Sequence, residues 1–108
     1  MLLVLCTFPD LERARQIGTL LVEKQLAACV NLLPGVESIY RWEGQVESAG
    51  EVIAIFKTTR EAFSGFRDAL AESHPYEVPE ILALEAASES APYLRWLIEE
   101  TEPSEERP

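Results

Sequence analysis

Short apolar runs and amphipathic stretches follow one another along this chain in an order that few folds accommodate. The apolar runs predict four strands, over residues 2–8, 27–42, 46–57 and 81–84. Apolar residues at helical spacing predict helices after Asp10 and Thr58, and a last helix from Tyr93 to Ile98. The order strand, helix, strand, strand, helix, strand typically builds a four-stranded antiparallel sheet with both helices on one face. We therefore predict an α+β fold, a ferredoxin-like βαββαβ sandwich with a C-terminal helix.

Local signals mark where these elements begin and end. Asp10 occupies the N-cap position of the first helix. Thr58 and Glu61 match a capping box at the start of the second helix, which should end at His74 because a proline follows it. Glu43-Gly44 supplies the turn of a long hairpin, since glycine adopts the positive φ that such turns need.

The predicted strands are apolar on both faces. Every residue from 52 to 56 is apolar, and so is every residue from 2 to 5, although successive strand side chains point to opposite faces. Two helices cover only one face, and an uncovered face of an antiparallel sheet should carry polar residues. We therefore predict a homo-oligomer in which another copy of the chain covers the second face. The alternative is that the C-terminal helix alone covers it.

Length and charge limit the classes of protein to which this chain can belong. A chain of 108 residues is one domain, and we expect residues 1–98 to form it and residues 99–108 to be an acidic, flexible tail. Nine lysines and arginines against nineteen acidic residues give a net charge of −10, which argues against a nucleic-acid partner. No apolar stretch approaches the roughly 20 residues of a membrane helix, so we predict no membrane partner.

The cysteines and the single histidine bear on where the protein is located and on whether it is an enzyme. No charged-then-apolar leader precedes Cys6 and Cys29, so we expect reduced thiols in the cytoplasm. The chain has a single histidine and none of the common hydrolase, kinase or dehydrogenase motifs, so we predict that it is not an enzyme. A small hydrolase that uses Arg60 and Asn31 is a weaker alternative, because no motif joins them.

The best candidate for chemistry is a metal site formed by Cys6 and His74. In the predicted sheet the start of the fourth strand lies beside the end of the first, which brings the loop after His74 close to Cys6. A thiolate and an imidazole favour copper or zinc over calcium or magnesium. The alternative reading is structural, with Cys6 a small buried hydrophobe and His74 a helix-terminal residue.

Two further pairs of residues have more than one reading. Glu77 and Glu80 flank the same loop and resemble an acid/base pair, but side chains around a proline there more often point into water. Tyr40 and Trp42 lie on one face of the hairpin, where they either stack a ligand or pack against a neighbouring subunit. We favour the subunit interface for this pair.

Several blocks of residues, in the same order, are shared with one known family. They are Leu26-Ala27-Ala28-Cys29-Val30-Asn31, Ser38-Ile39-Tyr40-Arg41-Trp42-Glu43-Gly44, Lys57-Thr58, His74-Pro75-Tyr76-Glu77-Val78-Pro79-Glu80-Ile81 and Tyr93-Leu94-Arg95-Trp96. Over residues 2–98 the chain resembles the CutA divalent-cation tolerance proteins. The resemblance implies a ferredoxin-like protomer in a homotrimer built like the PII signalling proteins, located in the cytoplasm, which binds copper and other divalent ions and has no established enzymatic activity.

The resemblance also implies which residues hold the metal. Family members that bind copper use the thiol that corresponds to Cys6 and the histidine that corresponds to His74. Some members carry a second histidine before it, where this chain has Ser73. The alternative function is a PII-like signalling or scaffold trimer that binds a small ligand in the clefts between subunits.

Overall fold

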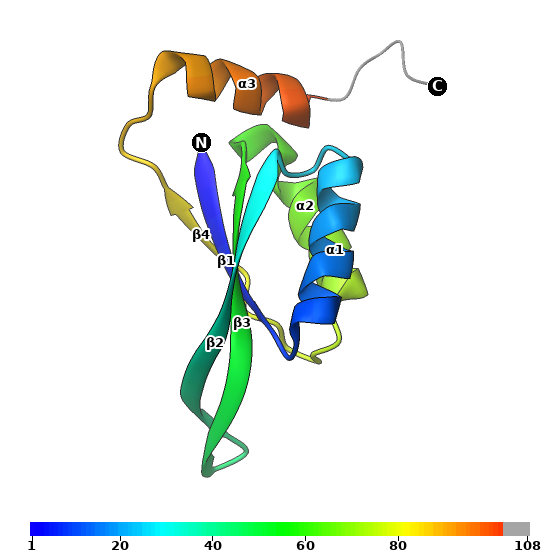
Figure 1. Cartoon of the computed structure of the whole chain (residues 1–108), viewed down its shortest axis with the longest axis vertical. Helices are drawn as coiled ribbons and strands as arrows, with labels where there is room; N and C mark the ends of the chain where they lie inside the picture. Colours follow the sequence, from blue (N-terminus) through cyan, green and yellow to red (C-terminus); the bar gives the residue numbers. More distant parts are fainter. Residues whose placement is uncertain (103–108) are drawn as a thin grey trace.

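The computed structural model describes residues 1–102 and contains one four-stranded sheet with three helices (Figure 1). The elements are β1 (Leu2–Phe8), α1 (Leu11–Glu23), β2 (Cys29–Trp42), β3 (Gln45–Thr58), α2 (Arg60–Ser73), β4 (Leu82–Glu85) and α3 (Ala91–Thr101). The strand order is β2-β3-β1-β4, and every neighbouring pair is antiparallel. This is the ferredoxin-like α+β sandwich that the sequence predicts.

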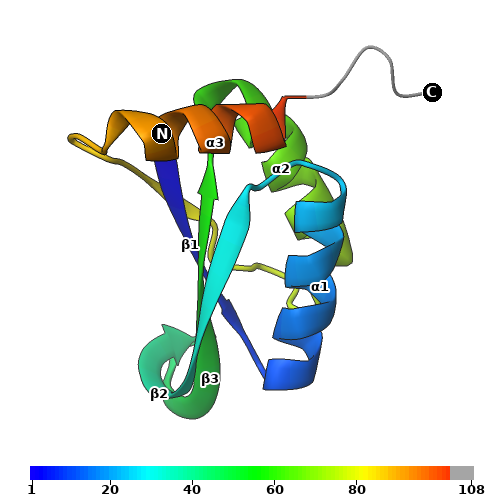
Figure 2. The same ribbon diagram turned by 45° about the horizontal axis from the view of Figure 1, so that its top comes forward.

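The hydrophobic core lies between the sheet and the two long helices, α1 and α2, which lie on the same side of it (Figures 1 and 2). Burial alternates along β1, where Leu2, Val4, Cys6 and Phe8 are buried beneath the helices. The core side chains of α1 and α2 include Leu21, Phe66 and Leu70. The buried side chains of β1, which occur at every second position, therefore pack against the apolar faces of α1 and α2 in a single core.

The helix ends confirm one predicted cap and correct the other. The Asp10 carboxylate accepts the backbone N–H of Arg13 at 2.8 Å, as an N-cap should. The predicted capping box that begins at Thr58 is wrong, because the N-cap of α2 is Thr59, whose hydroxyl accepts the N–H of Ala62 at 3.1 Å. Thr58 is the last residue of β3, and its buried hydroxyl donates to the Leu26 carbonyl at 2.7 Å.

The β2–β3 hairpin is longer than the rest of the sheet and projects beyond it (Figure 1). Its turn is at Glu43-Gly44, where φ is 49° and 80°, and Trp42 pairs with Gln45. Strand β1 ends opposite Val52, so the part of the hairpin beyond that residue is a two-stranded arm. A bulge between Leu33 and Val36 bends this arm where it leaves the sheet.

The face of the sheet opposite α1 and α2 is apolar and partly exposed. Its side chains are Leu3, Leu5, Leu33, Ile53, Ile55, Leu82 and Leu84. Leu33, Leu82 and Leu84 expose 46%, 51% and 46% of their surfaces. Helix α3 lies across one end of the sheet (Figure 2) and reaches this face through Tyr93, whose hydroxyl is 3.6 Å from the Cys29 sulfur. Within residues 1–102, α3 leaves most of the face open.

Helix α3 continues to Thr101, past the predicted domain end at residue 98. Thr101 is buried and its hydroxyl donates to the Leu97 carbonyl at 2.8 Å, so the start of the predicted acidic tail belongs to the helix. Residues 103–108, which make up the rest of that tail, lie outside the described residues. In the part of the chain that the structure describes, no helix is long and apolar enough to span a membrane.

Candidate functional site

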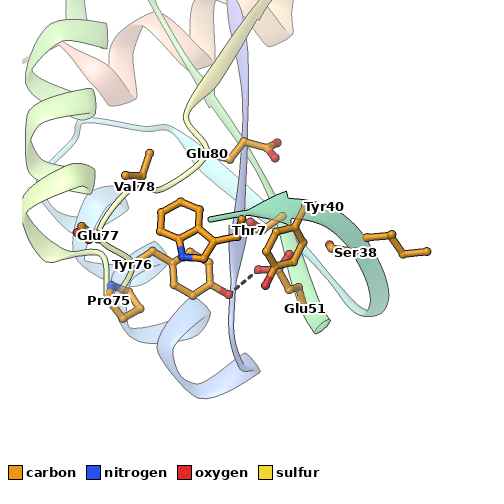
Figure 3. Close-up of a pocket in the computed structure, with 11 residues that line it drawn as sticks. Thr7, Ser38, Tyr40, Glu51, Pro75, Tyr76, Glu77, Val78 and Glu80 are labelled. Carbon is orange, nitrogen blue, oxygen red and sulfur yellow. Dashed lines mark hydrogen bonds between the residues drawn. The ribbon is translucent and has the colours of Figure 1, made fainter. Parts of the chain in front are cut away.

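A pocket of about 680 Å³ opens where the hairpin arm leaves the sheet (Figure 3). The loop that follows α2 closes its other side. The pocket is lined by Thr7 of β1, by Ser38, Ile39, Tyr40 and Trp42 of β2, by Glu51 of β3, and by Pro75, Tyr76, Glu77, Val78 and Glu80 of the loop. A volume of this size is in the range of small-molecule sites.

The strand register explains why residues so far apart in sequence share this pocket. Ser38, Tyr40 and Trp42 occupy alternate positions of β2 and therefore point to the same side of the arm. Glu51 lies on β3 at the base of the arm, and Figure 3 shows its carboxylate facing the hydroxyl of Tyr76. That hydroxyl donates to the Glu51 carboxylate at 2.5 Å, which joins the loop to the sheet.

His74 connects the end of α2 to the end of β1. Its Nε2 donates to the carbonyl oxygen of Thr7 at 2.7 Å, and its Nδ1 accepts the backbone N–H of Tyr76 at 3.0 Å. Its ring also stacks on Phe8, with the ring centroids 4.6 Å apart. These two hydrogen bonds require a neutral imidazole with its proton on Nε2. Burial lowers the pKa of His74, against the opposing effects of the Thr7 carbonyl and the Glu51 charge.

Cys6 lies in the core under the helices and exposes none of its surface. Its sulfur contacts the Thr7 carbonyl oxygen at 3.7 Å. Burial, the largest cause, and the negative charges of Glu80 and Glu51 together raise the pKa of the thiol from 9.0 to about 12. Cys6 therefore carries its proton at neutral pH, since both burial and nearby carboxylates disfavour a thiolate.

The structure brings the two predicted metal ligands to the same place. The Cys6 sulfur and the His74 Nε2 both contact the carbonyl oxygen of Thr7. Ser73 adds no ligand there, because its hydroxyl donates to the Ala69 carbonyl within α2. Among residues 1–102, no group of three or more histidine, cysteine or acidic side chains is arranged around one point. Whether Cys6 and His74 bind a metal ion stays a prediction.

Sequence reasoning did not find two of the pocket residues that bear on its chemistry. Nothing in the sequence marked Glu51 as a pocket residue, because an acidic residue at the start of a strand usually faces water. Tyr76 was part of the motif shared with the CutA proteins, but its partner was not apparent from the sequence. Cys29, by contrast, lies away from Cys6, and both cysteines are free of disulfide bonds.

Comparisons with known proteins agree with this architecture. The profile of the family described as CutA1 divalent ion tolerance protein matches residues 2–100. The divalent-cation tolerance protein CutA of Thermus thermophilus is 49% identical over 98 residues, which cover 91% of this chain and 95% of that protein. A solved structure of the Thermus thermophilus protein superposes with a TM-score of 0.90 at 48% identity, over 94% of this chain and 99% of the other.

A plant relative is longer than this chain, and its name places it in the chloroplast. The Arabidopsis thaliana protein named CutA, chloroplastic, is 38% identical over 96 residues, which cover 89% of this chain but 53% of that protein. This chain therefore spans about half the length of the plant relative.

The fold and the pocket define a ferredoxin-like α+β protein with an elongated hairpin and a small-molecule-sized cavity at its base. With a family profile that spans almost the whole chain and a relative at 49% identity, the protein belongs to the CutA divalent-cation tolerance family. The family resemblance seen in the sequence is confirmed.

Proposed function

We propose that the protein is a homotrimeric, non-enzymatic, cytoplasmic protein that binds a divalent cation, copper in the first instance, and contributes to metal tolerance. Membership of the divalent-cation tolerance family supports the link to metal ions. The observation that carries the proposal is the convergence of the Cys6 sulfur and the His74 Nε2 on one carbonyl oxygen, that of Thr7. Sulfur and imidazole nitrogen are donors that suit copper.

The proton positions define what metal binding at this pair requires. The Cys6 thiol has to lose its proton, because the thiolate is the metal ligand. His74 has to move its proton from Nε2 to Nδ1, which breaks the hydrogen bond from the Tyr76 N–H. Cation uptake at this pair is therefore coupled to proton release and to movement of the loop that begins at Pro75.

The exposed apolar face supports the oligomeric part of the proposal. Single chains rarely leave a contiguous apolar sheet face in water, and a second copy of the chain buries it without a further partner. Both cysteines are unpaired, which agrees with a reducing compartment. Cell fractionation of the expressed protein tests the cytoplasmic location.

Native mass spectrometry with copper under reducing conditions tests the proposal. We expect the wild-type protein to have the mass of three chains and to take up one ion per chain. Cys6→Ala and His74→Gln should each lose this uptake, whereas the matched variant Cys29→Ala should keep it. Equal uptake by Cys6→Ala and wild type overturns the assignment of Cys6, and a single-chain mass overturns the trimer.

A second candidate function is a PII-like signalling or scaffold trimer that binds a small ligand. The pocket between the hairpin arm and the loop after α2 favours it, because its volume of about 680 Å³ suits a small organic molecule. The two functions use different residues, since neither Cys6 nor His74 lines this pocket. Variants can therefore separate them.

A further inference from the structure

The pocket at the base of the hairpin arm combines aromatic rings with carboxylates. Tyr40, Trp42 and Tyr76 contribute the rings, and the carboxylates are those of Glu51, Glu77 and Glu80. Neither lysine nor arginine is among the lining residues, all of which belong to the described part of the chain. The lining therefore presents π-faces and negative charge with no cationic side chain to neutralise it.

The negative charge acts inside the pocket as well as at its rim. Glu51 is half-buried and is held by the Tyr76 hydroxyl, so its carboxylate has a defined position among the residues that line the pocket. Glu77 and Glu80 are exposed on the loop above it. An anion in this pocket would meet repulsion from several sides.

The aromatic rings select among cations. Within residues 1–102 no three acidic, cysteine or histidine side chains are arranged around one point, and Glu51 is already hydrogen-bonded. Tyr40 and Trp42 expose 44% and 45% of their surfaces, and in the described part of the chain no lysine or arginine lies over either ring. Ring faces attract weakly hydrated organic cations, most strongly those with several alkyl groups on nitrogen.

We propose that this pocket binds a small organic ammonium ion that carries an apolar group. This inference rests on the second candidate function and names the class of its ligand. The alkyl groups on the ammonium nitrogen pack against the ring faces of Tyr40 and Trp42, and the positive charge lies within the field of Glu51. The exposed Glu77 and Glu80 attract the cation toward the opening, an effect that salt screens.

Isothermal titration calorimetry of the full chain with benzyltrimethylammonium tests the proposal. Phenylacetate and benzyl alcohol serve as the anionic and neutral compounds of similar size. We expect saturable binding of the ammonium ion only, which weakens when salt is added. Trp42→Leu should weaken binding about tenfold and Glu51→Gln about fivefold, in line with the strengths of cation–π and partly screened charge interactions.

Matched variants control for general effects of each substitution. Trp96→Leu removes another half-exposed tryptophan, on α3, and Glu23→Gln removes an exposed carboxylate on α1; neither residue lines the pocket. Both should bind the ammonium ion as wild type does. Equal weakening by the matched variants would place the binding elsewhere and overturn the proposal.

Other outcomes separate the ligand class from the wider function. If the neutral or anionic compound binds instead and Trp42→Leu abolishes its binding, the pocket is a ligand site but the proposed class is wrong. If none of the three compounds binds, the proposal is overturned. Copper uptake by Trp42→Leu should match wild type, because Trp42 contacts neither Cys6 nor His74 in any hydrogen bond or ring stack, so the copper test separates the first proposed function from this one.

Discussion

The Cys6 sulfur and the His74 Nε2 contact the same acceptor, the backbone carbonyl oxygen of Thr7, at 3.7 and 2.7 Å. The two residues are 68 positions apart in the chain and meet because β1 ends beneath the end of α2. Each atom holds a proton that it would have to give up in order to ligate a metal ion. Both contacts with the Thr7 carbonyl oxygen therefore form without a metal ion, and loss of either proton would disturb them.

The raised pKa of Cys6 predicts that its thiol resists alkylation. At pH 8 a thiol with a pKa of about 12 has about a thousandfold less thiolate than one with the ordinary value of 9.0, and Cys6 is also inaccessible. With iodoacetamide, we expect peptide mass spectrometry to find modification at Cys29 and almost none at Cys6.

The unfolded protein is the control for this experiment. In concentrated urea both cysteines should be modified at similar rates, because burial no longer protects Cys6. Rapid labelling of Cys6 in the native protein would show that the end of β1 opens readily, contrary to this prediction.

The lowered pKa of His74 predicts a loss of stability in acid. Burial holds the folded pKa below the ordinary value of 6.5, so the unfolded chain binds the proton more tightly than the folded chain does. The contribution of His74 to the free energy of unfolding is complete above pH 6.5 and is lost as pH falls through the folded pKa. Urea unfolding at a series of pH values measures it.

A variant isolates this contribution from that of the carboxylates. His74→Leu cannot titrate, so its free energy of unfolding should change less than that of wild type between pH 7 and pH 5. Parallel pH profiles for the two proteins would show that His74 does not titrate in this range. Chain concentration has to be equal throughout, because assembly contributes to the measured stability.

The N-cap of α2 predicts that stability depends on a hydroxyl at position 59. Thr59→Ala removes the side-chain acceptor for the Ala62 N–H and should reduce the free energy of unfolding by about 1 kcal/mol. Thr59→Ser keeps a hydroxyl acceptor at the same position and should cost less. Chemical denaturation measures both variants. Equal losses in the two variants would contradict the assignment of the cap.

The apolar sheet face predicts a substitution that dissociates the assembly. Ile53→Glu places a charge in the middle of that face, and burying it against another subunit would cost several kcal/mol. The protomer should stay folded because Ile53 is only half-buried in the single chain. Light scattering should show the mass fall from three chains to one, while circular dichroism is unchanged. Gln16→Glu on the exposed side of α1 is the control and should keep the wild-type mass.

Much of the fold was predictable because its signals are local. The apolar run before Pro9, the Asp10 cap and the Glu43-Gly44 turn each act within a few residues, and each lies where it was expected. The α2 cap was misassigned because Thr58 and Thr59 are both good caps in isolation. The pairing of β3 with β1 continues through Thr58, opposite Leu2, and this places the first residue outside the strand at Thr59.

The candidate site was only partly predictable. The proximity of Cys6 and His74 could be predicted from strand order alone, since antiparallel pairing places the start of β4 beside the end of β1. The hydrogen bonds that occupy both nitrogens of His74 did not follow, because they depend on the path of the loop after α2. The pocket shared by Trp42, Glu51 and Tyr76 depends on the same path.

The sequence by itself determined the order of the elements, the two-faced apolar strands and the family to which the chain belongs, because periodicity and motifs are properties of neighbouring residues. Only the tertiary structure decided which groups meet at the end of β1. It placed a protonated thiol and a neutral imidazole on one carbonyl oxygen and put the carboxylate of Glu51 in the same pocket as the aromatic rings of the hairpin arm. Protonation and charge depend on burial and on neighbours distant in sequence, and these exist only once the chain has folded.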